Sequence, residues 1–118
     1  MKLKIYVSGA ISGHPLDSVR ERFAMMKHKL QQDGYDVLIP TENGLPPDAP
    51  WERHMAKDIN LLMECDIILM LDGWQKSRGC RIEFNCAVEA RKTIIFEKKN
   101  ESGLHMSTES YKGGKVVS

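Results

Sequence analysis

Three features that would point to a membrane or to nucleic acid are missing from this sequence. The 17 Lys and Arg nearly balance the 16 Asp and Glu, so no net charge attracts the chain to polymeric nucleic acid. No apolar run approaches the ~20 residues of a membrane-spanning helix, and the chain starts with a strand-like segment instead of an apolar signal core. We therefore expect a cytoplasmic protein that binds neither nucleic acid nor membranes.

Cysteine is scarce, and its placement argues against two of its usual roles. The three cysteines are an odd number without the spacing of metal ligands: Cys65, Cys80 and Cys86. Two of them fall in predicted helices beside apolar residues. We interpret them as reduced core residues, and we expect neither a metal nor another cofactor.

The chain does contain the alternating strand and helix patterns of one α/β domain. Apolar runs predict strands at 4–7, 35–39, 67–71 and 93–96, and apolar spacings of three and four predict helices at 16–33, about 51–64 and about 79–91. Because the strands are almost wholly apolar, we expect a doubly wound, Rossmann- or flavodoxin-like three-layer sandwich with a four- to five-stranded parallel sheet. We assign residues 1–96 to this domain and 97–118 to a polar tail, in which 115–117 can form one more strand.

Glycine and hydroxyl side chains concentrate in the loops after the first and third predicted strands. These loops are 8–13 and 73–79, and they would meet at the carboxyl edge of the sheet, where doubly wound folds bind ligands, if their strands are neighbours. A third loop, 40–50, holds four prolines and a glycine. It is long enough to form a wall or a lid of that crevice.

Glu83 is an unexpected residue for its position. On the predicted third helix it shares a face with Cys80 and Ala87, at i−3 and i+4. A carboxylate turned toward the protein loses hydration, which is tolerated when it is paired or when a raised pKa is useful. The alternative, which a lone helical Glu favours, is that Glu83 reaches solvent or pairs with Arg81 or Arg91.

Asp58 is a second carboxylate on an apolar helix face, with Met55 at i−3 and leucines at i+3 and i+4. If Asp58 and Glu83 converge, their pKa values separate, so that one can attack while the other holds a proton, as in glycosidic bond cleavage. An ion pair of Asp58 with Arg53 or His54 is nearly as well supported by spacing. His54 itself fits a solvated position.

The turn 76–79 precedes the Glu83 helix, where free N–H groups and the helix dipole favour an anion. Ser77 adds a hydroxyl, and Gly79 lets a ligand approach the backbone. Ser77 can equally serve only as the helix N-cap, and the two roles are compatible. Trp74 and Trp51 can stack on a base or pack beneath their own loops.

These residues resemble the nucleoside 2-deoxyribosyltransferase superfamily over about residues 3–96. The resemblance rests on KIYVSGAISG, on Asp58 and on SRGCRIEFNCA, in which Ser77, Gly79, Glu83 and Ala87 keep the superfamily's order. It is closest to the 2'-deoxynucleoside 5'-phosphate N-hydrolase branch, and GWQKSRG is similar to small, often phage- or prophage-encoded relatives.

The resemblance implies an N-glycosidase acting on a nucleotide or nucleoside, such as a (deoxy)nucleoside 5'-monophosphate. Glu83 would attack C1' and form a glycosyl-enzyme ester, Asp58 would orient sugar and nucleophile and assist proton transfer, and Tyr6 would lie beside the nucleophile. A homodimer or larger homo-oligomer is also implied. The substrate-binding residues that we expect are Gly9, Ile11, Ser12, Gly13, Trp74, Ser77, Arg78 and Gly79.

The chain departs from that branch at its phosphate side. The loop after the first strand has Ala10 and Ser12 where the hydrolases usually carry a serine and an arginine, and a bulkier Arg81 stands where a glycine is usual. Either Arg78, Arg81 or His14 replaces the missing charge, or the ligand is not a simple nucleoside monophosphate. Base exchange by transfer and a non-catalytic nucleotide-binding module are the alternatives, although a pure binder has no need of the Glu83 carboxylate.

Overall fold

The computed structural model describes residues 2–100, 103–106, 110–112 and 115–117, with side chains described for residues 2–98. Helices and strands alternate in the predicted order. Its strands, helices and two short 3₁₀ helices are β1 (Lys4–Ser8), α1 (Leu16–Gln32), β2 (Asp36–Leu38), η1 (Pro40–Glu42), α2 (Trp51–Met63), β3 (Ile67–Met70), η2 (Trp74–Lys76), α3 (Arg78–Glu89), β4 (Thr93–Asn100), β5 (Gly103–Met106), β6 (Ser110–Lys112) and β7 (Lys115–Val117).

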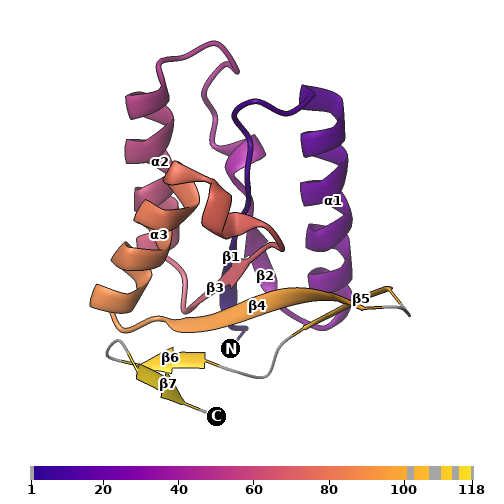
Figure 1. The fold of residues 1–118 in the computed structure, drawn as a ribbon, viewed down its shortest axis with the longest axis vertical. Helices are drawn as coiled ribbons and strands as arrows, with labels where there is room; N and C mark the ends of the chain where they lie inside the picture. The colour runs from indigo at the N-terminus through magenta and orange to yellow at the C-terminus, as the bar shows by residue number, and fades with distance from the viewer. Residues whose placement is uncertain (1, 101–102, 107–109, 113–114, 118) are drawn as a thin grey trace.

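The middle layer is a five-stranded sheet in the order β2-β1-β3-β4-β5. The strands β1 to β4 pair in parallel, and β5 pairs antiparallel with β4. Helix α1 covers one face of the sheet, and α2 and α3 cover the other (Figure 1). The predicted α/β sandwich is therefore confirmed. Because β1 lies beside β3, the glycine-rich loops that follow them are neighbours at one edge.

Alternation along β1 decides which of its side chains face the future site. Ile5 and Val7 pack into the core under α1, whereas Tyr6 packs into the core under α2 and α3. Successive strand residues point to opposite faces, so Ser8 lies on the same face as Tyr6. Both residues are fully buried, at 0% exposure, and both therefore point toward α3.

Two loop glycines shape the crevice. A Cβ added to Gly9 would lie 2.6 Å from Cδ1 of the fully buried Leu71, so a larger residue there would displace the Leu71 side chain where the loop after β1 passes over the end of β3. Gly73 has a φ of 86°, the left-handed conformation that glycine adopts without strain. It turns the chain from β3 into η2 and then into α3.

The C-terminal part differs from the expected polar tail. Strand β4 continues past its predicted end at Phe96, because β5 supplies main-chain partners from Glu97 to Asn100. Residues 115–117 do form a strand, β7, but it pairs with β6 and not with the main sheet. The sequence analysis did not predict β5 and β6, which lie in the segment that we assigned to a polar tail. Among the described residues, no helix is long and apolar enough to cross a membrane.

Candidate active site

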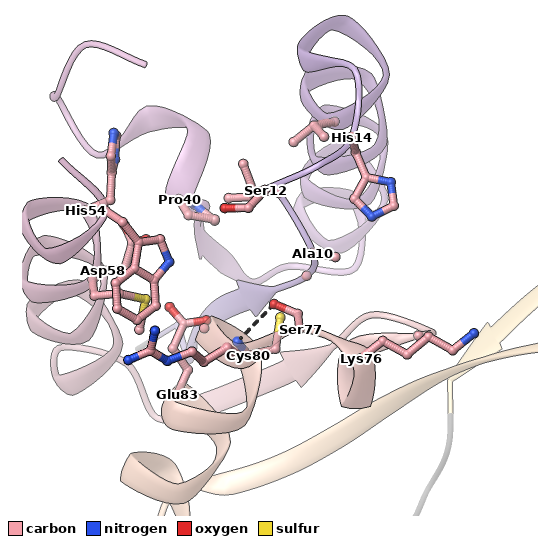
Figure 2. A pocket seen from close by; sticks show the side chains of 18 of the residues that line it. Ala10, Ser12, His14, Pro40, His54, Asp58, Lys76, Ser77, Cys80 and Glu83 are labelled. Atoms are coloured by element: carbon pink, nitrogen blue, oxygen red, sulfur yellow. Dashed lines mark hydrogen bonds between the residues drawn. The ribbon is translucent and has the colours of Figure 1, made fainter. Parts of the chain in front are cut away.

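A cavity of about 820 Å³ opens at the carboxyl edge of the sheet, where the loops after β1 and β3 meet α2 and α3. That volume lies within the ~300–1,000 Å³ typical of small-molecule sites. The wall on the α2 side includes Pro40, Pro47 and Ala49, so the loop 40–50 forms a wall as expected. Asp58 from α2 and Glu83 from α3 both line this cavity (Figure 2).

The Glu83 carboxylate is held from β1 at both of its oxygens. The Tyr6 hydroxyl donates to Oε2 at 2.6 Å, and the Ser8 hydroxyl donates to Oε1 at 2.7 Å. Only 5% of Glu83 is exposed, so the alternative in which it reaches solvent or pairs with Arg81 or Arg91 is wrong. The sequence reasoning missed Ser8, although its strand parity with Tyr6 could have identified it.

Burial raises the pKa of Glu83 from 4.5 to about 7. The hydrogen bonds from Tyr6 and Ser8 lower this pKa, because they stabilise the charged form, and the charge of Asp58 raises it. The two carboxyl groups therefore interact electrostatically. Burial and the Glu83 charge also hold the pKa of Tyr6 well above 10, so the Tyr6 hydroxyl keeps its proton and acts as a donor.

Asp58 is held from the loop 40–50 at one oxygen. The Asn43 amide nitrogen donates to Oδ1 at 2.9 Å, and Asp58 is 5% exposed. An ion pair with Arg53 or His54 is therefore not its environment. Burial raises the pKa of Asp58 to about 6, while the Asn43 hydrogen bond and any positive charge on His54 lower it.

Sequence reasoning also missed a hydrogen-bond network behind Asp58. The Asn43 amide nitrogen lies 3.0 Å from Nδ1 of His54, and Nε2 of His54 lies 3.1 Å from the Pro46 carbonyl oxygen. His54 is half-buried and lines the cavity, and both of its ring nitrogens have partners, so it has a structural role beyond that of the solvated residue we expected. No periodic signal in the loop pointed to Asn43.

The turn before α3 is built as a helix N-terminus, and its residues line the cavity. Oγ of Ser77 accepts a hydrogen bond from the Cys80 N–H at 3.3 Å (Figure 2), so the N-cap role of Ser77 is observed. A Cβ on Gly79 would lie 3.2 Å from Sδ of Met55. The absence of a side chain at Gly79 therefore lets α3 pack close to α2. The Arg78 guanidinium stacks over the Trp51 ring, with its carbon 4.5 Å from the ring centroid.

Of the cations expected at the phosphate side, Arg78 and His14 line the cavity. Arg81 does not line it, and its guanidinium donates to the Gln75 carbonyl at 2.8 Å. A cation that the sequence did not suggest, Arg22 of α1, also lines the cavity, as does Lys76.

The Arg22 guanidinium is held against the loop after β3. It donates to the Asp72 carbonyl at 2.9 Å and to the buried Glu97 carboxylate at 3.2 Å. Glu97 also accepts from the Asp72 N–H at 2.9 Å. The anchor thus orients Arg22 beside the cavity.

Gly9, Ile11 and Ser12 line the cavity, but three predicted site residues do not: Tyr6, Trp74 and Gly13. Tyr6 is fully buried behind the Glu83 carboxylate, to which it donates. Trp74 packs instead on Phe84, with ring centroids 4.7 Å apart, and next to Phe96 at 6.0 Å. This aromatic contact belongs to the core under α2 and α3, because η2 turns the indole away from the crevice. Gly13 also lies outside the cavity lining, in the turn before α1, with a φ of 83°.

The cysteines are free, and Cys65 and Cys80 are buried, as expected of core residues. Cys80 lines the cavity, but burial raises the pKa of its thiol. The thiolate needed for nucleophilic attack is therefore disfavoured there. Within the described part of the chain, no three His, Cys, Asp or Glu side chains are grouped as metal ligands.

Comparisons with known proteins give one family and a shared fold. Residues 3–96 match the model of the family described as "Domain of unknown function (DUF4406)". No curated protein matches the chain.

Two solved structures share the fold. A 2-desoxiribosyltransferase from Leishmania mexicana has a TM-score of 0.66 and 20% identity, over 83% of this chain and 65% of that one, just under two thirds of its length. The CMP N-glycosidase BcmB from Clostridium botulinum has a TM-score of 0.56 and 22% identity, over 79% of this chain and 69% of that one.

Proposed function

Because the chain belongs to the DUF4406 family, whose description assigns no activity, we propose a function from the site itself: an N-glycosidase that cleaves the bond between base and sugar in a nucleotide or nucleoside. The observation that carries this proposal is the buried Glu83, fixed at both oxygens by Tyr6 and Ser8 and placed in one cavity with Asp58. Glycosidic cleavage needs one ionised carboxylate as the nucleophile and one protonated carboxyl group as the acid. The pKa of Glu83, about 7, lies above that of Asp58, about 6, so we assign the two roles from the geometry and not from the order of the pKa values.

In the proposed reaction, a carboxylate oxygen of Glu83 forms a bond to C1' as the C1'–N bond breaks. The bonding electron pair leaves with the base, which takes a proton from Asp58. Water then attacks C1', passes a proton to Asp58, and the C1'–O bond to Glu83 breaks. The products are the free base and the free sugar or sugar phosphate, and both carboxyl groups return to their starting states.

Three cations of the cavity lining, Arg22, Lys76 and His14, support a 5'-phosphate on the substrate. The N-terminus of α3 also borders the cavity, and its free N–H groups favour an anion. Arg22 would thus supply the charge that the loop after β1 lacks. The solved CMP N-glycosidase of the same fold makes a nucleoside monophosphate a reasonable substrate class.

Base exchange is the second candidate, favoured by the fold shared with a 2-desoxiribosyltransferase. In that reaction a second base, instead of water, would attack C1' of the glycosyl-enzyme. The acceptor is then the only difference between the two functions.

Base release from a panel of ribo- and deoxynucleosides and their 5'-monophosphates, followed by chromatography, tests the proposal. Wild type is expected to release base from at least one member, and Glu83→Gln is expected to release it at least about 10³-fold more slowly. Release at the same rate by both proteins would contradict the mechanism. A new nucleoside formed on adding a second free base would identify transfer, and tight binding without release would identify a binding module.

A further inference from the structure

Asn43 is a buried side chain whose hydrogen-bonding groups are all engaged. It follows η1, is 4% exposed, and its Oδ1 accepts from the Leu45 N–H at 2.9 Å. A backbone N–H can only donate, so the atom facing Leu45 must be the amide oxygen. The NH₂ group therefore faces the other way, toward Asp58 at 2.9 Å and His54 at 3.0 Å.

This orientation determines the tautomer of His54. The Asn43 NH₂ group can only donate, so Nδ1 of His54 must accept and carries no proton. Nε2 faces the Pro46 carbonyl oxygen at 3.1 Å, which can only accept, so Nε2 carries the proton. The ring is thus the neutral Nε2–H form, and it ties α2 to the loop on both sides of Leu45.

The same network leaves Asp58 with two different oxygens. Oδ1 accepts from Asn43, and no other hydrogen bond or ion pair of Asp58 is present among the described residues. Every buried side-chain oxygen in that part of the chain has a partner, so Oδ2 is not buried and opens to the cavity that Asp58 lines. When Asp58 is protonated, the Asn43 donor favours the carbonyl form at Oδ1 and places the acidic proton on Oδ2.

We propose that Asn43 is a positioning residue that directs the acidic proton of Asp58 into the cavity, and that His54 holds the Asn43 amide in the required orientation. This inference rests on the proposed function, in which Asp58 protonates the leaving base. The Asn43 amide contacts Asp58, His54 lies behind Asn43, and Glu83 and Tyr6 interact electrostatically with Asp58. Neither Asn43 nor His54 needs to touch the substrate.

The first test requires no activity. Nitrogen-15 NMR of wild type should show His54 as the Nε2–H tautomer, and carbon-13 titration should show the pKa of Asp58 rising in Asn43→Ala, because a hydrogen bond that lowers it is lost. An Nδ1–H tautomer, or an Asp58 titration that Asn43→Ala leaves unchanged, would overturn the inference.

The second test uses matched variants at His54, which contacts Asn43 and not Asp58. In His54→Asn, the new amide oxygen can lie where Nδ1 of His54 lies and accept from Asn43, whereas His54→Leu offers Asn43 no acceptor. His54→Leu should lower kcat about 10-fold with KM within about 2-fold, and Asn43→Ala should lower kcat about 10- to 100-fold, both below the ~10²–10⁴-fold worth of a general acid. His54→Asn should restore most of the loss.

Lys57→Gln is the control, because Lys57 is an exposed neighbour of Asp58 on α2 outside the cavity; its kcat should stay at wild type. A His54→Asn variant as slow as His54→Leu, or losses that appear in KM alone, would contradict a positioning role. If wild type released no base from any substrate, the proposed function would fail, and the NMR measurements would still decide whether Asn43 orients Asp58.

Discussion

The two carboxyl groups of the cavity are held by different kinds of structure. Glu83 is fixed at both oxygens by Tyr6 and Ser8, which lie on a central strand with 0% exposure. Asp58 is fixed at one oxygen by Asn43, which belongs to an irregular loop. A nucleophile gains from a rigid position, whereas an acid must keep one oxygen open to give up its proton. The comparison suggests that the sheet positions the attack and the loop positions the proton.

Replacing Glu83 should have the largest effect, because it removes the group that forms the covalent bond. Glu83→Gln should lower the single-turnover rate of base release by about 10³-fold or more. Asp58→Asn should cost less on substrates whose base leaves readily without a proton. Equal losses for both variants on such a substrate would contradict the division of roles.

The stability of the fold should also depend on the Glu83 end. The pKa of Glu83 is about 7 in the folded state against 4.5, so the folded state binds more protons between these values and stability falls as the pH rises from 4.5 to 7. Glu83→Gln removes this loss. The free energy of unfolding of the variant minus that of wild type should therefore be about 2–3 kcal/mol larger at pH 8 than at pH 4. Denaturant unfolding at the two pH values measures this, and a pH-independent difference would argue against a buried ionisable Glu83.

Removing one donor from Glu83 should have a smaller effect. Tyr6→Phe should lower kcat about 10- to 100-fold. It should also shift the acidic limb of the pH–rate profile to higher pH, because the Tyr6 hydrogen bond lowers the Glu83 pKa in wild type and its loss lets that pKa rise. Ser8→Ala should shift it in the same direction. An acidic limb that stays in place in both variants would separate that limb from Glu83.

The smallest expected effect concerns Arg22, one of the cations proposed to bind the phosphate. Arg22→Gln should raise KM for a nucleoside monophosphate about 10-fold, as expected from ~1.4 kcal/mol for one charged contact, and should leave KM for the matching nucleoside nearly unchanged. A similar rise for both substrates would place the phosphate elsewhere.

The sequence predicts the site residues of regular helices and strands better than those of irregular segments, for a physical reason. Glu83 and Asp58 were found because a carboxylate interrupts the apolar face of a regular helix, and Tyr6 was suggested only by the family resemblance. Ser8 was within reach of the same logic, since strand alternation puts it beside Tyr6. Periodicity carries this information wherever the backbone is regular.

The irregular segments gave no such signal. Asn43 reaches Asp58 through a loop whose path depends on its prolines and on His54, and Trp74 turned into the core because Gly73 and η2 redirect the chain. Arg22 looked like an ordinary charged residue of α1, since its partner Glu97 lies far along the sequence in β4. Contacts of this kind depend on the tertiary arrangement and not on local pattern.

The most direct test of a covalent role for Glu83 is to trap the glycosyl-enzyme. Wild type is mixed with a deoxynucleoside monophosphate that it cleaves, and the reaction is quenched in acid within one turnover. The protein is then digested and its peptides are examined by mass spectrometry. The account predicts an added mass of one deoxyribose phosphate on the peptide that contains Glu83, absent from Glu83→Gln. Rapid base release with no such adduct, or an adduct on another residue, would contradict it.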